Sequence, residues 1–331
     1  MEPKRTFNVA PLRSVHQLIS VLEFVLPKSF SSKDYSERDK TVSINSYTTV
    51  LRRPGVPHEV FATYWRDVHG PLCSRIPGLA WYVQNHFNRE QDAHLWPAAE
   101  NIPPFENYVL DGGVEIGFET LADQKEFNAA CSILFADEQN MFAATVAYAL
   151  PSGSTTLKDC ISESNPNGDD GFDRIHVHIG SRSNDRESFS TFMNELAQTF
   201  TSDPLLLKVR LHLPDPYDNA KPAPPAPNVE HTVSSERRLV AILELAFETP
   251  LKRRAFYESD LYRNTVEQQK KHIGHVSAFA VSGVYTYVRD KKLTVAGMRG
   301  SRPAQLIEKL GALNQIKDDV SHLMFSGTLR P

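Results

Sequence analysis

Residues 64–86 decide how this chain folds, and they read YWRDVHGPLCSRIPGLAWYVQNH. They join a periodic stretch, residues 58–76, to a strand-like stretch, residues 79–87. In the periodic stretch, apolar side chains recur at steps of four, three, four and four residues, at Phe61, Trp65, Val68, Leu72 and Ile76. This spacing predicts a helix with one apolar face, which Gly70 and Pro71 are expected to kink or interrupt.

The same order of elements occurs in both halves of the chain. In the first half, strands are predicted over 42–50, 79–87, 114–120 and 143–150, and helices over 58–76 and 122–135. In the second half, strands are predicted over 174–180, 205–213, 239–247 and 276–288, and helices over 185–200 and 252–271. Each half is therefore a ferredoxin-like βαββαβ unit. We predict an α+β fold in which the two units pair their sheets and form an intrachain dimeric α+β barrel.

Two stretches of biased composition divide the chain. Residues 151–171 are rich in Ser, Gly, Asn and Asp and are expected to be a linker. Residues 214–227 are rich in proline and are expected to form an extended, exposed loop within the second half. The predicted organisation is an N-terminal helical extension at 1–40, units at 41–150 and 172–300 on either side of the linker, and a C-terminal helical tail at 301–331.

The composition excludes two classes of partner. Among 331 residues, 36 Lys and Arg stand against 40 Asp and Glu, which gives a formal net charge of -4. Without a basic stripe such a chain is a poor match for a phosphate backbone, so no nucleic-acid partner is expected. No apolar run approaches the roughly 20 residues of a membrane span, so no membrane partner is expected.

Targeting and redox signals favour the cytoplasm. The most apolar N-terminal run, residues 18–26, is interrupted by Glu23, ended by Pro27 and followed by no small-residue cleavage site. We expect a short amphipathic helix there that docks on the body of the protein. The three cysteines are an odd number without CxxC spacing, which suits a reducing compartment.

The motif within residues 64–86 resembles the EthD-domain family of dimeric α+β barrel proteins. The matching pieces are Tyr64-Trp65, Asp67, His69-Gly70-Pro71-Leu72, Pro77-Gly78-Leu79 and Tyr82-Val83-Gln84-Asn85-His86. The second half lacks the Trp-x-x-x-His-x-Pro pattern, so we expect a diverged copy and a single-chain pseudo-dimer. Whether that copy carries a site of its own is left open.

The resemblance implies an enzyme that works without a cofactor or metal on small cyclic or aromatic molecules. The closest expectation is a lyase, either a decarboxylase or a dehydratase, in fungal polyketide tailoring or related secondary metabolism. A cofactor-free oxygenase, or an isomerase or cyclase of an aromatic substrate, is the alternative among enzymes. A barrel that binds small molecules without chemistry is the alternative from another class.

His69 is the strongest candidate for acid–base chemistry. Its imidazole titrates near neutral pH, and the expected break at Gly70 would turn the ring out of the helical register. The other interpretation is a ring that caps the helix end. Asp67 would orient His69 only if the helix is broken there, and Tyr64 lies at the margin of the apolar face. The predicted catalytic residues are His69, His86, Tyr64 and Asp67.

The strand at residues 79–87 offers a polar face. Tyr82, Gln84 and His86 share one side of it, because side chains alternate along a strand. A polar row turned inward must be hydrogen-bonded, either to a substrate or among its own side chains, and both interpretations are open. Tyr47, on the first strand, is expected to continue the same pocket. The predicted substrate-binding residues are Tyr47, Trp65, Tyr82, Gln84 and Trp81.

The sequence contains one candidate metal site and no cofactor-binding motif. His176 and His178 form a His-x-His pair on a predicted strand, and His212 or His231 would supply a third ligand. No Cys or carboxylate stands at ligand spacing nearby, so no metal is predicted. Without a GxGxxG turn, P-loop or GxSxG motif, no cofactor is predicted either. The amphipathic residues 297–315 are expected to be a packing or oligomer surface, which leaves a homodimer open.

Overall fold

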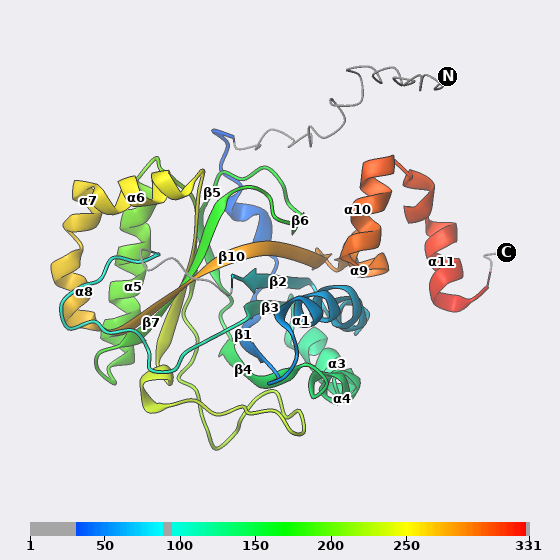
Figure 1. Cartoon of the computed structure of the whole chain (residues 1–331), viewed down its shortest axis with the longest axis horizontal. Coiled ribbons are helices and arrows are strands. Elements are labelled where there is room, and N and C mark those ends of the chain that lie inside the picture. Colours follow the sequence, from blue (N-terminus) through cyan, green and yellow to red (C-terminus); the bar gives the residue numbers. More distant parts are fainter. Residues whose placement is uncertain (1–30, 89–94, 329–331) are drawn as a thin grey trace, which may run out of the picture.

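The computed structural model describes residues 31–88 and 95–328. The predicted N-terminal helix at residues 18–26 lies outside the described residues. The described chain begins with a 3-10 turn, η2 (Ser36–Asp39), which leads into the first unit. Figure 1 shows a curved sheet with helices on two sides and a helical arm that extends from it.

The first unit is a four-stranded antiparallel sheet with its helices on one face. The strands are β1 (Ile44–Arg52), β2 (Trp81–Phe87), β3 (Gly112–Phe118) and β4 (Phe142–Leu150), in the order β4-β1-β3-β2. The helices are α1 (His58–Tyr64), a π turn η3 (Trp65–His69), α2 (Gly70–Ser74), α3 (Leu121–Ala130) and α4 (Ser132–Glu138). A capping box between Thr120 and Asp123 starts α3.

The second unit repeats this arrangement. Its strands are β7 (Asp173–Ser181), β8 (Leu206–His212), β9 (Val240–Phe247) and β10 (Ile273–Arg289), in the order β10-β7-β9-β8. Its helices are α5 (Arg186–Thr201), α6 (Pro250–Glu258), α7 (Asp260–Arg263) and α8 (Val266–His272), and a 3-10 turn η4 (Ser235–Arg237) precedes β9. The predicted α+β fold of two ferredoxin-like units is confirmed.

One long strand joins the two sheets. The first part of β10 pairs with β7, and its last part pairs with β2, where Tyr285 lies opposite Gln84 (Figure 1). The helices lie on the outer faces, so the two inner faces turn toward each other and enclose a barrel interior. There Arg210 of β8 forms an ion pair with Glu115 of β3.

Connecting segments cover the remaining sheet edges. The edge of β8 pairs with β5 (Thr155–Asp159), and a short β6 (Asn167–Gly168) pairs with β10. Both strands fall within residues 151–171, so the segment expected to be a linker also contributes strands to the sheet. The backbone N–H and C=O groups at the edge of β8 need hydrogen-bond partners. The backbone of a polar, Thr-rich segment supplies them as well as that of an apolar segment would.

The proline-rich loop is less exposed than predicted. Its backbone pairs with the edge of β4, where the Ala147 amide donates to the Ala223 carbonyl at 2.9 Å and the Thr145 amide donates to Glu230 at 3.0 Å. The side chain of Tyr217 is buried. The loop therefore belongs to the second half of the sequence but packs on the first unit.

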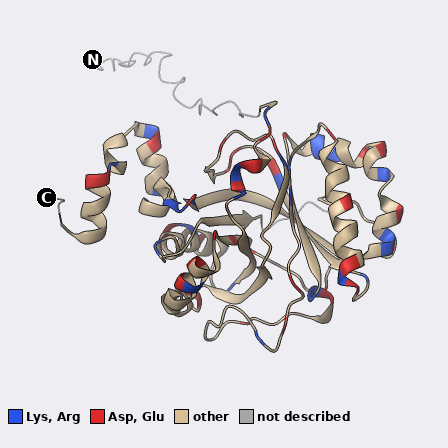
Figure 2. Cartoon of the chain, turned by 180° about the vertical axis from the view of Figure 1, so that it is seen from behind, with Lys and Arg blue, Asp and Glu red and all other residues tan. Residues whose placement is uncertain are grey.

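The C-terminal segment forms an arm beyond β10. It follows β11 (Lys292–Leu293) and consists of α9 (Val295–Arg299), α10 (Ser301–Leu310), a 3-10 turn η5 (Leu313–Ile316) and α11 (Asp318–Ser326), as Figure 1 shows. Leu310 and Leu313 are exposed on it. On the helices of the second unit, charged residues of both signs lie side by side (Figure 2). Within the described ranges, no helix combines the length and the apolar character that a membrane crossing requires.

Candidate functional site

A cavity of about 460 Å³ lies between the sheet of the first unit and its helices. Its sheet wall includes Thr48, Val114 and Ile116, and its helix wall includes Trp65, His69, Phe127 and Leu134. Residues 223–225 of the proline-rich loop also line it. None of the described lining residues is Lys or Arg. The cavity is thus mostly apolar, with a few polar groups that face a common space.

His69 reaches this cavity from a widened helical turn. The backbone keeps helical dihedral angles through Gly70, and the Gly70 amide donates to the Trp65 carbonyl, five residues back. The helix is therefore not broken at Gly70 and Pro71, and the irregularity at this place is a π turn. Pro71 has no amide hydrogen, so it cannot donate to the helix, and the chain accommodates it by a π turn in place of a break. The His69 side chain is buried, with 6% exposed.

Asp137 holds the ring of His69. The Nδ1 atom of His69 lies 2.9 Å from Oδ2 of Asp137. The other carboxylate oxygen of Asp137, Oδ1, accepts hydrogen bonds from Tyr64 (2.6 Å) and Asn140 (3.2 Å). Burial raises the pKa of Asp137, but the hydrogen bonds from His69 and Tyr64 outweigh it and lower that pKa below its ordinary value. A charged Asp137 fixes the proton of His69 on Nδ1. Nε2 is then free to exchange a proton with a molecule in the cavity.

Glu138 is a second carboxyl group at the same cavity. It is the last residue of α4, is 8% exposed and accepts one weak hydrogen bond from Thr145, at 3.4 Å. Burial raises its pKa to about 8, and the charge of Asp137 adds to the increase. The carboxyl group is therefore protonated at neutral pH.

Asp137 and Glu138 were not among the residues predicted from the sequence. They lie 68 and 69 positions after His69, and no local spacing connects them to it. The sequence contains only a weak indication that these two residues belong to the site. Two acidic residues close a helix that faces the same sheet as the helix of His69, and contacts across such a gap depend on the fold.

Two cysteines line the cavity without offering a nucleophile. Burial raises the pKa of Cys131 to about 12 and raises that of Cys73 as well. Both thiols are therefore protonated at neutral pH, and only a thiolate attacks readily.

The predicted polar row on β2 lies behind the cavity and is satisfied internally. Gln84 donates to the Trp65 carbonyl (3.1 Å) and to Tyr82 (2.7 Å), and it accepts from Nε2 of His86 (3.0 Å). His86 stacks on Trp65 with ring centroids 4.2 Å apart. Burial lowers the pKa of His86 well below its usual range. Of this row, only Tyr82 lines the cavity.

Six of the nine predicted site residues do not line the cavity: Gln84 and His86 of the polar row, Tyr64 beside Asp137, and Tyr47, Trp81 and Asp67. Tyr47 and Trp81 belong to the inner faces of β1 and β2, where Tyr47 binds His176 (2.6 Å) and Arg289 lies over the Trp81 ring (4.0 Å). The expectation that Tyr47 continues the pocket is corrected, because Ser46 and Thr48 occupy the face of β1 that meets the helices. Asp67 forms an ion pair with Arg66 at 2.7 Å and does not orient His69. Asp137 is the carboxylate that contacts the His69 ring.

The His-x-His pair, His176 and His178, which was a candidate metal site, lies in the barrel interior. His176 and His178 both bind the hydroxyl group of Tyr47, and burial lowers the pKa of each. Among the described residues, the group near enough to share a metal ion is Glu115, His212 and Glu244, with ligand atoms within 4.8 Å of one another.

Cations of the protein itself already neutralise that group. Arg210 lies 2.6 Å from Glu115, and Lys208 lies 3.0 Å from Glu244. The buried Arg210 and the half-buried Lys208 thus balance the charges of the two buried carboxylates, and such an ion-paired network suits a metal ion poorly.

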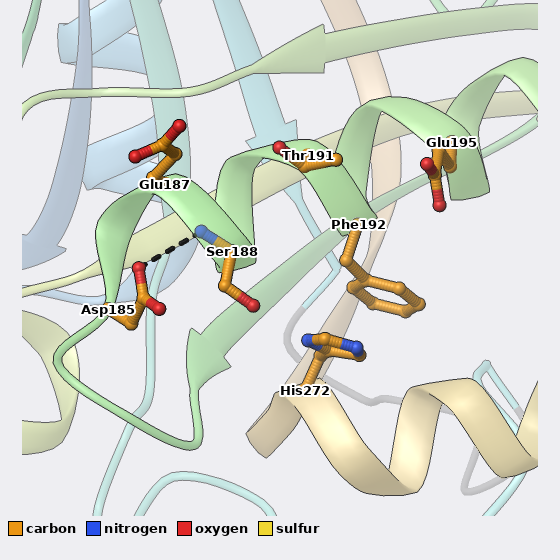
Figure 3. A pocket seen from close by; sticks show the side chains of 7 residues that line it. All are labelled: Asp185, Glu187, Ser188, Thr191, Phe192, Glu195 and His272. Atoms are coloured by element: carbon orange, nitrogen blue, oxygen red, sulfur yellow. Dashed lines mark hydrogen bonds between the residues drawn. The ribbon is translucent and has the colours of Figure 1, made fainter.

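A second hollow lies on the outer surface of the second unit. It lies along α5, as Figure 3 shows. Its volume is about 350 Å³. Asp185 and Glu187 at its rim are exposed, and the His272 ring stacks on Phe192 with centroids 4.6 Å apart. In contrast, the space between the sheet and helices of this unit is filled by a large apolar core, including Phe189, Met193, Leu196, Phe200, Phe247, Phe256 and Tyr262. The second unit thus lacks the counterpart of the cavity at His69.

Comparisons with known proteins agree with the motif. Residues 53–149 match the family model described as EthD domain, which confirms the resemblance found in residues 64–86. The matched range contains His69, Asp137 and Glu138. No curated relative matches the sequence.

Several solved structures are similar in their chain path. A candidate monooxygenase from Fusobacterium nucleatum has 8% identity and a TM-score of 0.48, over 76% of this chain and 96% of its own. An anthrone oxidase-like protein has 8% identity and a TM-score of 0.46, over 80% of this chain and 100% of its own. A chlorite dismutase variant from Candidatus Nitrospira defluvii has 13% identity and a TM-score of 0.37, over 75% and 95%.

Proposed function

We propose that the EthD-type unit at residues 53–149 is the active unit of a lyase that moves protons with His69. The observation that carries the proposal is the hydrogen bond between His69 and Asp137 at the wall of a mostly apolar cavity. An imidazole that is oriented by a carboxylate and lines a ligand-sized space is an arrangement suited to general acid–base catalysis.

The cavity favours a small, largely apolar substrate. A volume of about 460 Å³ lies within the usual range for small-molecule sites. The lining offers aromatic and aliphatic side chains, with the hydroxyl groups of Tyr82, Ser46 and Thr48 as hydrogen-bonding groups. A polyketide-like or phenolic compound fits this chemistry. Because side chains alone supply and accept the protons, the proposed reaction uses no cofactor.

The test compares His69→Ala and Asp137→Asn with the parent protein. Two probes cover the two lyase reactions: the aldol adduct of benzaldehyde and acetone, which can lose water, and benzoylacetic acid, which can lose carbon dioxide. We expect His69→Ala to lower kcat roughly 100- to 10,000-fold on the probe that is turned over. Asp137→Asn should lower kcat less and leave KM nearly unchanged, because it misorients His69 without altering the cavity.

His58→Ala is the matched control, since His58 begins the same helix but does not line the cavity. Binding of β-naphthol, followed by its fluorescence, reports the integrity of the cavity in each variant. Unchanged turnover in His69→Ala would exclude the proposal. Retained binding without turnover of either probe by the parent protein would favour a carrier of small molecules.

The same cavity would also serve a cofactor-free oxygenase. Removal of a phenolic proton by His69 is the first step of that reaction too, and an apolar cavity admits dioxygen. Consumption of oxygen with an electron-rich phenol, lost in His69→Ala, would replace the lyase by this alternative.

A homodimer is a separate proposal. Leu306, Leu310 and Leu313 are exposed along the C-terminal arm, and together they are the surface on which we expect a second copy to pack. Size-exclusion chromatography with light scattering tests the dimer directly.

A further inference from the structure

Glu138 stands out among the groups that line the cavity. Glu138 lines the same cavity as His69, its carboxyl group lies beside Thr145 of the cavity wall, and 8% of the residue is exposed. Among the described residues it has no ion-pair partner, and its one hydrogen bond, from Thr145, is long at 3.4 Å. A carboxylate in such surroundings would be strongly destabilised, whereas a neutral carboxylic acid is not.

The two neighbouring acidic residues therefore differ in charge. Successive side chains of a helix point about 100° apart, so Asp137 turns toward His69 while Glu138 turns toward Thr145 of β4. Hydrogen bonds lower the pKa of Asp137, and burial raises that of Glu138 to about 8. In many active sites, the surroundings shift the pKa values of two carboxyl groups in opposite directions, so that one acts as an acid and the other stays charged.

We propose that Glu138 is a second catalytic residue of this cavity and that it donates the proton to a hydroxyl group as that group leaves. The reaction is then the dehydration of an uncharged β-hydroxy carbonyl compound. This inference rests on the proposed function, because it requires His69 as the base.

The step balances without an oxidant or a further reactant. Nε2 of His69 takes a proton from the carbon next to the carbonyl group, and the electron pair of that C–H bond forms the new C=C bond. The bond between the neighbouring carbon and its hydroxyl oxygen breaks, and the hydroxyl group leaves as water with the proton of Glu138. The released water then returns the proton of His69 to the Glu138 carboxylate, which restores both groups.

The charge of the lining selects this substrate class over a carboxylic acid. No described Lys or Arg lines the cavity, so a substrate carboxylate would find no cation there. It would also approach the charged Asp137, which lies beside Glu138 in the chain. In addition, decarboxylation needs only one proton donor, so either His69 or Glu138 would have no role in it.

The experiment separates proton abstraction from loss of water. Benzylacetone, which has the skeleton of the aldol adduct but no hydroxyl group, reports abstraction by its uptake of solvent deuterium. The aldol adduct itself reports elimination by the absorbance of the conjugated enone. We expect Glu138→Gln to retain deuterium uptake within a few-fold and to lower elimination roughly 100-fold or more. His69→Ala should lower both.

Glu126→Gln is the matched control, because Glu126 is exposed on the neighbouring helix. Elimination that survives in Glu138→Gln would overturn this inference and leave the proposed function standing. Deuterium uptake and elimination that both survive in His69→Ala would overturn the proposed function itself.

The parent protein supplies a second measurement that does not depend on folding of the variant. Glu138 donates a proton only while it is protonated, so kcat for elimination should fall as the pH rises through about 8. Deuterium uptake by benzylacetone should show no such fall. A kcat for elimination that stays level through this range would contradict the role of Glu138.

Discussion

Asp137 and Glu138 are adjacent residues of one helix, yet their carboxyl groups have different surroundings. Asp137 accepts hydrogen bonds from His69, Tyr64 and Asn140. Glu138 accepts one long hydrogen bond from Thr145 and faces an apolar cavity. The surroundings, and not the residue type, decide which carboxyl group is charged at neutral pH.

Glu138 should make the stability of the protein depend on pH. Its pKa is 4.5 in an unperturbed chain and about 8 in the folded protein, so between these values the folded state holds one more proton than the unfolded state. The free energy of unfolding should therefore fall as the pH rises across this window, by up to about 1.4 kcal/mol per pH unit from this group. Glu138→Gln should remove that loss. Urea denaturation of both proteins at several pH values measures the difference.

Comparison with the Glu126→Gln control isolates the contribution of Glu138, since other groups titrate equally in all three proteins. If the difference in the free energy of unfolding between Glu138→Gln and the parent stays constant from acid to alkaline pH, this result would contradict a buried, protonated carboxyl group. A difference that widens in favour of the variant as the pH rises is the expected result.

Sequence and structure agree unevenly at this scale. His69 could be found because its motif is local and histidine is a common acid–base residue. Asp137 approaches it only through packing of α4 beside the π turn, across 68 residues of sequence. Tyr47 was misplaced because period-two alternation separates the two faces of a strand but does not say which face meets the helices.

The start of β3 shows how an element is shaped by its neighbours. Gly112 and Gly113 begin this strand, and a Cβ atom at either position would collide with an aromatic ring. At Gly112 the ring is the indole of Trp65, on the side of the helices, and at Gly113 it is the ring of Tyr47, on the inner side. The two glycines therefore let the sheet contact large side chains on both faces.

Gly112→Ala should destabilise the protein and disturb the cavity. The added methyl group has to displace Trp65 or the β2 backbone, and overpacking of this kind costs about 1–3 kcal/mol. Urea denaturation measures the loss of stability, and β-naphthol binding measures the change at the cavity, whose wall includes Trp65. An alanine variant as stable as the parent would show that the indole ring is free to move.

Regular elements were predictable, and irregular ones were not. Alternation and helical periodicity predicted the strands and helices of both units, since these patterns follow from burial of one face. The π turn at Trp65–His69 escaped prediction, because Gly70 and Pro71 are equally compatible with a break. One helix was predicted over residues 252–271, but Ser259 takes an extended conformation and caps a new helix, α7. Short polar residues serve as caps wherever tertiary packing requires a turn.

The whole molecule joins two similar units with different interiors. The first unit keeps a cavity, whereas aromatic side chains such as Phe200 and Phe256 fill the equivalent space of the second. The second half nevertheless contributes to the cavity, because residues 223–225 of its proline-rich loop form part of the wall. The two halves are therefore unequal in role as well as in sequence.

Replacement of Pro224 and Pro225 by Gly should weaken substrate binding and leave the chemistry intact. Glycine gives the loop more conformational freedom, so more entropy is lost when the wall closes over a ligand. We expect KM to rise several-fold and kcat to stay within about two-fold, because His69 and Glu138 are untouched. Steady-state kinetics with the aldol adduct measures both constants.

The matched control replaces Pro216, which is exposed in the same loop and does not line the cavity. A kcat that falls together with the affinity in the Pro224 and Pro225 variant would show that the loop also helps to position the reacting groups.

The filled interior of the second unit has a mechanical consequence. A close-packed core has low compressibility and deforms little, so the part of the sheet that it supports, which continues through β10 into β2, is a stiff base for the cavity. A change in the shape of the cavity would then come from its helix side, where α4 carries both Asp137 and Glu138.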